Sequence, residues 1–138
     1  MIRRVLIDSD VILDVALARQ PFVEASRVVL AVLENGKAVG FASSNSITNI
    51  YYVLRKAGGD AKAREFIGNL LRYLTALPID HADLLKALKS DFADFEDGVQ
   101  NCAALSHQCE AIVTRNGKDY ASSELEVFLP IEFLRNYE

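Results

Sequence analysis

The sequence has few of the residues that build zinc–thiolate sites, disulfide frameworks or histidine-based catalysis. Its 138 residues include no tryptophan, two cysteines and two histidines. No pair of cysteines has zinc-ligand spacing, and Cys102 and Cys109 are expected on one helix, two turns or about 10 Å apart. Because a disulfide needs its two Cα atoms within about 7 Å, both are expected to be buried free thiols, as in a reducing compartment.

Long apolar runs are also missing. No stretch approaches the roughly 20 apolar residues that a membrane-spanning helix needs. The segment before Asp8 holds two arginines and only a short apolar run, which is too short for a signal peptide. We therefore expect a cytoplasmic protein without membrane contact, and the length fits one domain over residues 1–138.

An excess of basic residues is absent as well. The net charge is −4, which argues against a protein that binds nucleic acid through its overall charge. It does not exclude a nuclease, because an acidic metal site adds negative charge that bound cations offset. No G-x-G-x-x-G follows the first expected strand, which argues against a nicotinamide-binding domain.

What the chain does have is a regular alternation of short β-branched runs and helical periodicity. Strands are expected at 5–7, 38–42, 77–79, 111–114 and 127–129. Helices are expected at 11–18 and from Pro21 to Leu33, after a cap at Ser43 or Ser44, from Asp60 through Leu74, after Asp80, at 96–108 and from Pro130. The alternation predicts an α/β fold, with a central parallel sheet of four to five strands between helices.

Polar side chains gather where the expected strands end. In an open parallel sheet, ligands bind at the carboxyl ends of the strands, so side chains placed there can meet. His81 and His107 do not follow a strand end, so a histidine general base is not expected. The residues placed at this edge are Asp8, Ser9, Asp10, Asn49, Asp94, Glu96, Asp97, Thr114, Arg115, Asn116 and Asp119.

Several carboxylates at one edge repel one another, and a divalent cation removes that penalty. Hard oxygen ligands suit Mg²⁺ or Mn²⁺, which can activate water for phosphodiester cleavage. Each residue also has a plain structural interpretation. Asp8 could simply cap a helix, and the acidic residues at 94–97 could favour a helix N-terminus. Asp10 and Asp14 are expected to face solvent or to cap.

Four segments together resemble the PIN-domain family, and specifically its VapC-like toxin ribonucleases. Residues 5–14 resemble the family's opening strand with its first catalytic aspartate, and residues 46–52 resemble the helix that usually carries a glutamate. Residues 94–100 resemble the helix start with a further acidic residue, and residues 112–120 resemble the family's Thr-Arg-Asp or Thr-Arg-Asn segment. The order and spacing of these short motifs carry the likeness.

The resemblance implies a PIN-like three-layer α/β/α fold and a Mg²⁺- or Mn²⁺-dependent endoribonuclease. It implies the toxin of a toxin–antitoxin pair, with an RNA substrate, an antitoxin protein as partner and a homodimeric assembly. Carried over by residue, Asp8 and Asp97 are the core metal ligands.

This chain departs from the family pattern at two positions. Asn49 stands where a glutamate is usual, and Asn116 stands where a fourth aspartate is usual. An amide oxygen can coordinate a cation but brings no negative charge. Asp119 is therefore expected to join Asp8 and Asp97 as a metal ligand, with Glu96 and Asp10 as the alternatives. The expected catalytic set is Asp8, Asn49, Asp97, Asn116 and Asp119.

Two alternatives remain open at this point. A PIN-like fold with a weakened site could be a non-catalytic binding module. The segment Asp8-Ser9-Asp10-Val11 also resembles the nucleophile motif of haloacid-dehalogenase-like phosphatases, in which Asp8 would form an aspartyl-phosphate. Lys118 and Asp119 lie in the wrong relation for that chemistry.

Overall fold

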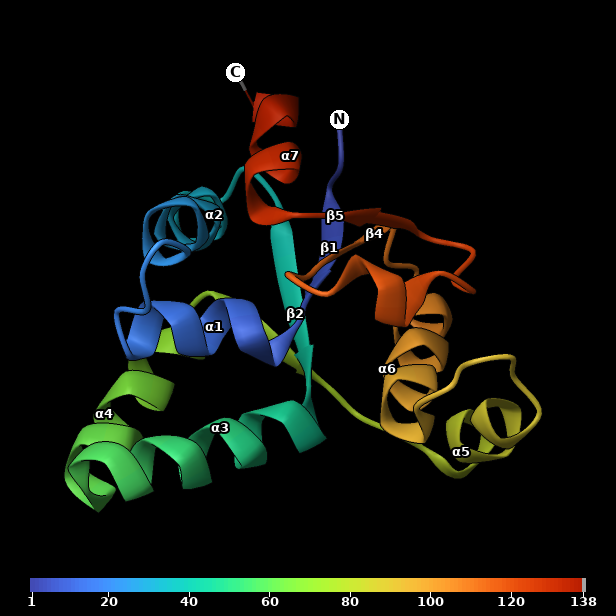
Figure 1. Ribbon diagram of the computed structural model, residues 1–138, viewed down its shortest axis with the longest axis horizontal. Coiled ribbons are helices and arrows are strands. Elements are labelled where there is room, and N and C mark those ends of the chain that lie inside the picture. The colour runs from blue at the N-terminus through green and yellow to red at the C-terminus, as the bar shows by residue number, and fades with distance from the viewer. Residues whose placement is uncertain (138) are drawn as a thin grey trace.

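A computed structural model of the chain describes residues 1–137, which form a five-stranded, all-parallel sheet with helices on both faces (Figure 1). The strand order is β3-β2-β1-β4-β5. The strands are β1 (Arg4–Ile7), β2 (Val39–Ser43), β3 (Leu74–Leu77), β4 (Ala111–Val113) and β5 (Glu126–Phe128). The helices are α1 (Ser9–Ala16), α2 (Val23–Glu34), α3 (Ser44–Gly58), α4 (Asp60–Leu70), α5 (His81–Leu88), α6 (Phe95–Ser106) and α7 (Pro130–Leu134), with 3₁₀ turns η1 (Gly117–Tyr120) and η2 (Arg135–Tyr137).

The central strand β1 is buried on both faces of the sheet. Val5 and Ile7 pack into one hydrophobic cluster, and Leu6 packs into the other. This follows from the two-residue period of a strand, which sends alternate side chains to opposite faces. A continuous apolar run is therefore what a parallel strand between two helical layers needs, and the sequence provides it.

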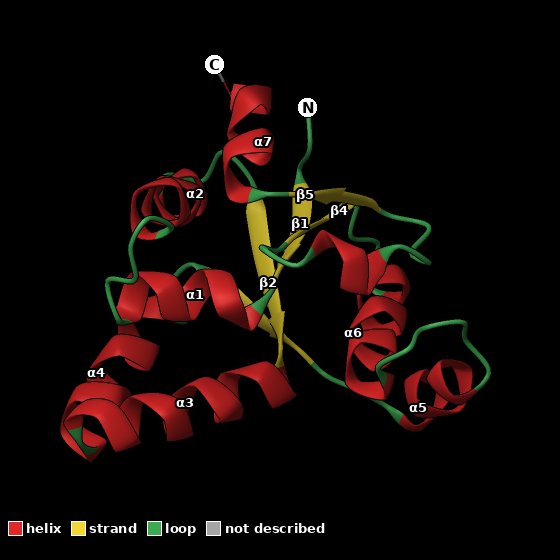
Figure 2. Cartoon of the chain, viewed as in Figure 1, coloured by secondary structure: helices red, strands yellow, loops and turns green. Residues whose placement is uncertain are grey.

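The helices divide between the two faces (Figure 2). Side chains of α1, α2, α3, α4 and α7 share the larger hydrophobic cluster, and α6 with η1 contributes to the smaller one on the opposite face. Helix α5 packs against α6. At Gly40 in β2 a side chain would collide with buried Leu33, so glycine allows α2 to lie close to the sheet.

The predicted α/β architecture is confirmed, but the predicted bounds of the third strand are wrong. The helix expected through Leu74 ends at Leu70, and β3 spans Leu74–Leu77 rather than 77–79. Leu74 and Leu77 are both buried and pair with β2. Pro78 has no amide hydrogen to continue the strand. The cap of α4 is also corrected, because Gly59 rather than Asp60 is the N-cap residue.

The two cysteines are free thiols, as expected. Cys109 is buried, which raises the pKa of its thiol to about 11, whereas Cys102 is only partly buried. Cys109 lies beyond the end of α6, so the two do not share one helix. In the part of the chain that the structure describes, no helix has the length and apolarity to cross a bilayer.

Candidate functional site

Asp8 lies at the carboxyl end of β1, and both of its oxygens are held. Its Oδ1 accepts a hydrogen bond from the backbone amide of Ser9 at 2.8 Å, so Asp8 is the N-cap of α1. Its Oδ2 accepts a hydrogen bond from the hydroxyl of Thr114, also at 2.8 Å. Because β1 and β4 are neighbours, the residues that follow them meet across the sheet edge. Capping and a site role for Asp8 are therefore compatible.

Asp10 belongs to the same group of side chains. The expectation that it faces solvent is wrong. Its Oδ2 accepts hydrogen bonds from the backbone amide of Arg115 at 3.2 Å and from Nδ2 of Asn116 at 2.8 Å. Burial and the neighbouring carboxylate of Asp8 raise its pKa to about 6. Its Oδ1 is buried and has no hydrogen-bond partner among residues 1–137, which is unusual for a carboxylate oxygen.

The expectation for Asp14 is also wrong. Asp14 is fully buried, and the guanidinium of Arg115 binds both of its oxygens through Nε and Nη2. Arg19 lies 3.6 Å from the same carboxylate. The guanidinium of Arg115 also lies 4.0 Å from the ring centroid of Phe22. A carboxylate inside the protein needs such a partner, because an unpaired buried charge is strongly destabilising.

Asp97 lies in the first turn of α6, where Asp94 caps the helix by accepting a hydrogen bond from the Asp97 amide at 2.9 Å. The pKa of the Asp97 carboxyl rises to about 7, because the group is partly buried and because Asp94, Asp8 and Asp119 repel its negative charge. The structure thus brings Asp97 within electrostatic range of Asp8 and Asp119, as the sequence predicts.

A buried hydrogen-bond chain holds Asp97, and the sequence reasoning missed it. The Tyr120 hydroxyl lies 3.4 Å from Oδ1 of Asp97 and accepts a hydrogen bond from Nε2 of Gln100 at 2.9 Å. Oε1 of Gln100 accepts hydrogen bonds from the hydroxyls of Ser43 and Ser46. The side-chain amide of Gln100 donates to the Tyr120 oxygen, so the hydrogen of the Tyr120 hydroxyl is left to donate to Asp97. One signal was available, because Gln100 lies three residues after Asp97 on the same helix face.

The remaining predicted residues occupy different places. Asn116 is exposed and bound to Asp10, and the Asp119 amide donates to the Asn116 carbonyl at 3.0 Å. Asp119 is exposed, and its negative charge helps to raise the pKa of Asp97. Asn49 lies exposed on α3 and takes no part in the hydrogen bonds that join the carboxylates. The structure therefore groups four of the five predicted residues by contact or charge, and leaves Asn49 outside that network.

The oxygen donors of this site fit a hard divalent cation that is held by one or two carboxylates and keeps several water ligands. Within residues 1–137, no three histidine, cysteine or acidic side chains are arranged to hold a metal ion by themselves. Mg²⁺ commonly binds through one or two carboxylates and keeps several waters, so a complete protein cage is not needed. The unpaired Oδ1 of Asp10 and the mutual repulsion of the carboxylates are features that a cation would relieve.

Comparison with known proteins agrees with this architecture. The PIN domain family matches residues 4–118. The chain is 30% identical to Ribonuclease VapC1 of Aquifex aeolicus (strain VF5) over 139 positions, which cover 97% of this chain and 95% of that protein.

Two solved structures show the same fold. VapBC2 from Rickettsia felis, bound to a DNA fragment from its promoter, matches with a TM-score of 0.73 at 12% identity and covers 91% of this chain and 98% of that chain. Mycobacterium tuberculosis VapC20, a sarcin–ricin-loop-cleaving toxin, matches with a TM-score of 0.62 at 10% identity and covers 78% of this chain and 86% of that chain. With the fold, the acidic edge of the sheet and the sequence match in agreement, the chain belongs to the PIN-domain family, in its VapC-like group.

Proposed function

We propose that the chain is a Mg²⁺- or Mn²⁺-dependent endoribonuclease and the toxin of a toxin–antitoxin pair. The observation that carries the proposal is the position of Asp97, where partial burial and the nearby carboxylates of Asp94, Asp8 and Asp119 together raise its pKa to about 7. Such clustering of like charges opposes folding and is typical of sites that bind a cation or do acid–base chemistry. The 30% identity to a ribonuclease over nearly the whole chain supports the same activity.

In this proposal, Asp8 and Asp97 are the principal metal ligands. Asp119 does not complete a three-carboxylate group with them in the described residues, so the third ligand role expected for it requires its exposed side chain to move toward the ion. When bound, a divalent cation supplies Lewis acidity toward a phosphodiester and water activated for attack. The amide of Asn116 brings an oxygen without charge, so metal affinity is expected to be lower than in a site with four carboxylates. Asn49 is exposed on α3 and is assigned a role in orienting water or substrate.

The residues around the carboxylates keep them in place. Thr114 is fully buried and donates to Asp8, and its hydroxyl also accepts a hydrogen bond from the Asn116 amide at 3.0 Å. The Tyr120 hydroxyl likewise donates to Asp97 at 3.4 Å and accepts a hydrogen bond from Gln100. Hydrogen bonds to a carboxylate favour its charged form, which is the form that binds a cation.

The proposed partners are an RNA substrate, an antitoxin protein and a second copy of the chain. Structures of VapBC toxin–antitoxin complexes share the fold, which supports an antitoxin partner. Tyr52 and Val53 are exposed on α3 and offer apolar surface for contact between two copies.

The test combines metal binding with cleavage. Mn²⁺ and Mg²⁺ binding is measured by calorimetry on the wild type and on Asp97→Asn, and single-stranded RNA cleavage is followed on the same samples. Asp91→Asn is the matched control, because Asp91 is exposed and outside the carboxylate group. We expect Asp97→Asn to lose both binding and cleavage and Asp91→Asn to keep both. A wild type that binds neither ion at millimolar concentration and leaves RNA intact contradicts the proposal.

The second candidate is a PIN-like binding module without catalysis, and the two neutral residues Asn49 and Asn116 favour it. The same experiment separates the two, because a binding module leaves RNA intact in the presence of Mn²⁺ or Mg²⁺. The phosphatase interpretation of Asp8 loses its support, since the family match covers the motif on which it rested.

A further inference from the structure

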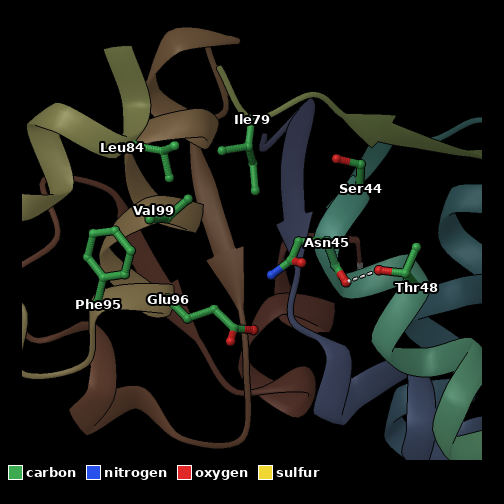
Figure 3. A pocket seen from close by; sticks show the side chains of 8 residues that line it. All are labelled: Ser44, Asn45, Thr48, Ile79, Leu84, Phe95, Glu96 and Val99. Atoms are coloured by element: carbon green, nitrogen blue, oxygen red, sulfur yellow. Dashed lines mark hydrogen bonds between the residues drawn. The ribbon is translucent and has the colours of Figure 1, made fainter. Parts of the chain in front are cut away.

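A groove of about 570 Å³ opens beside the acidic site, between the first turns of α3 and α6 (Figure 3). Its volume lies within the roughly 300–1,000 Å³ typical of small-ligand sites. One side of the groove is apolar and comes from α5, α6 and the segment before α5. The apolar side chains are Ile79, Leu84, Phe95 and Val99.

The opposite side of the groove comes from α3 and is polar, and Glu96 adds a carboxylate from the α6 side. Figure 3 shows the amide of Asn45 and the carboxylate of Glu96 reaching toward each other from α3 and α6. The hydrogen bond drawn there runs from the Thr48 hydroxyl to the backbone carbonyl of Asn45 at 2.8 Å, so it does not use the Asn45 side chain. Donor and acceptor groups therefore stand next to an apolar surface in one small space.

This pairing of surfaces fits a flat heteroaromatic ring better than an aliphatic side chain. Phe95 is 48% exposed, and its ring can stack on the face of such a heteroaromatic ring. An aliphatic group would cover Glu96 and Asn45 without satisfying them, and desolvating such groups without partners is unfavourable. Unpaired RNA bases are recognised by aromatic stacking together with hydrogen bonds to their edges, which is what this groove provides.

The groove also lies where RNA would pass. Glu96 immediately precedes Asp97, and β2, which leads into α3, is the neighbour of β1, which leads into Asp8. A nucleotide whose phosphate lies at the carboxylates can therefore place an adjacent base in the groove. The acidic rim argues against seating a phosphate in the groove itself, because Glu96 would repel it.

We propose that this groove is a base-binding subsite that prefers an unpaired guanine next to the scissile phosphate. The inference rests on the proposed ribonuclease function. Phe95 stacks on the base, and the carboxylate of Glu96 accepts hydrogen bonds from the two parallel N–H groups of the guanine edge. The Asn45 amide donates to the guanine carbonyl oxygen. Adenine, cytosine and uracil lack two adjacent donors on that edge, so they satisfy Glu96 less completely.

The test measures binding without cleavage. The trinucleotides UpGpU, UpApU, UpCpU and UpUpU are titrated into isotopically labelled full-length protein in EDTA, and backbone amide shifts are followed by NMR. We expect UpGpU to bind tightest and to shift amides of residues 44–48 and 95–99. Phe95→Ala should weaken UpGpU binding by about tenfold, a typical loss for one base–aromatic stack. Glu96→Gln should lower the preference for UpGpU over UpUpU by about tenfold, as for loss of a bidentate contact.

Two exposed residues outside the groove provide the controls. Leu88→Ala and Glu65→Gln remove similar groups on α5 and α4 and should leave binding and base preference unchanged. Equal binding of all four trinucleotides, or shifts away from the groove, overturns the subsite. A change of mass in light scattering for Phe95→Ala with RNA binding unaltered also overturns it, because the groove is then a contact between copies.

Cleavage is assayed separately, with Mn²⁺ and longer single-stranded RNA. If no RNA is cut while UpGpU still binds selectively in the groove, the nuclease proposal fails and the base subsite stands as part of an RNA-binding protein. If RNA is cut without regard to base and both variants behave as wild type, the nuclease stands and the subsite fails.

Discussion

Replacing Arg115 by methionine should be one of the most destabilising single changes near the acidic site. The substitution leaves Asp14 fully buried and removes both hydrogen bonds that Arg115 makes to its carboxylate. Only Arg19 remains as a charged neighbour, at 3.6 Å, with 39% of its side chain exposed. Methionine keeps apolar volume against Phe22, so the main loss is electrostatic.

The magnitude follows from the burial of the pair. Removing one partner of a buried ion pair typically costs about 3–5 kcal/mol, because the remaining charge stays desolvated. Arg19 compensates in part, so we expect a loss of about 3 kcal/mol in the free energy of unfolding, the lower end of that range. With a urea slope of about 1.5 kcal/mol per molar, the unfolding midpoint should fall by about 2 M.

The assay is urea unfolding followed by circular dichroism, with two comparisons. Arg64→Met breaks the exposed pair with Asp60 and should cause little change, since exposed pairs contribute little. The double change Asp14→Leu with Arg115→Met should recover most of the loss, because apolar replacement of a whole buried pair is often neutral. A loss below about 1 kcal/mol in the single variant, or no recovery in the double variant, would refute the argument from buried charge.

Two further predictions concern the carboxylates themselves. The raised pKa of Asp97, about 7, means that its protonated form contributes stability below about pH 4, which is lost as the pH rises through 7. In EDTA, the free energy of unfolding of wild type, measured by urea unfolding, should therefore fall relative to that of Asp97→Asn between pH 4.5 and 7.5. The same difference between the two proteins at both pH values would contradict this. Thr114→Val removes a buried hydroxyl that donates a hydrogen bond to Asp8, so the free energy of unfolding should fall by about 1–3 kcal/mol. Thr75 is exposed, so Thr75→Val should leave the free energy of unfolding unchanged. Equal losses in the two threonine variants, measured by urea unfolding, would show that the hydroxyl of Thr114 is not structural.

The layered fold could be predicted because its strands are short, apolar and separated by clear helical signals. The error at the third strand has a physical cause. Leu70, Leu74 and Leu77 follow one another at spacings of four and three residues, which a helix also satisfies. Pairing with β2 decides between the two states, and that contact cannot be read from a local pattern.

For the site, Asp8 was selected by its place after the first strand and Asp97 by its place at the start of a helix, and the resemblance to PIN domains singled out both as metal ligands. The roles of Asp10 and Asp14 were not predictable in the same way. They lie four residues apart on one face of α1, and both find their partners about a hundred residues later in the chain, at Arg115 and Asn116. Whether such a carboxylate meets solvent or a buried arginine depends on the packing of the completed sheet.

The position of β1 in the middle of the sheet has a consequence for synthesis. Strand β1 is synthesised before both of its neighbours, β2 on one side and β4 on the other, and β4 ends at Val113. The pairing with β4 cannot form before β4 has been made, and loop-closure entropy then makes such long-range pairing slow. The acidic edge needs the same late segment, since Asp8 is held by Thr114. A nascent chain that stops short of β4 and Thr114 therefore has the aspartate but not the site, so any activity of this edge begins only after both have been made.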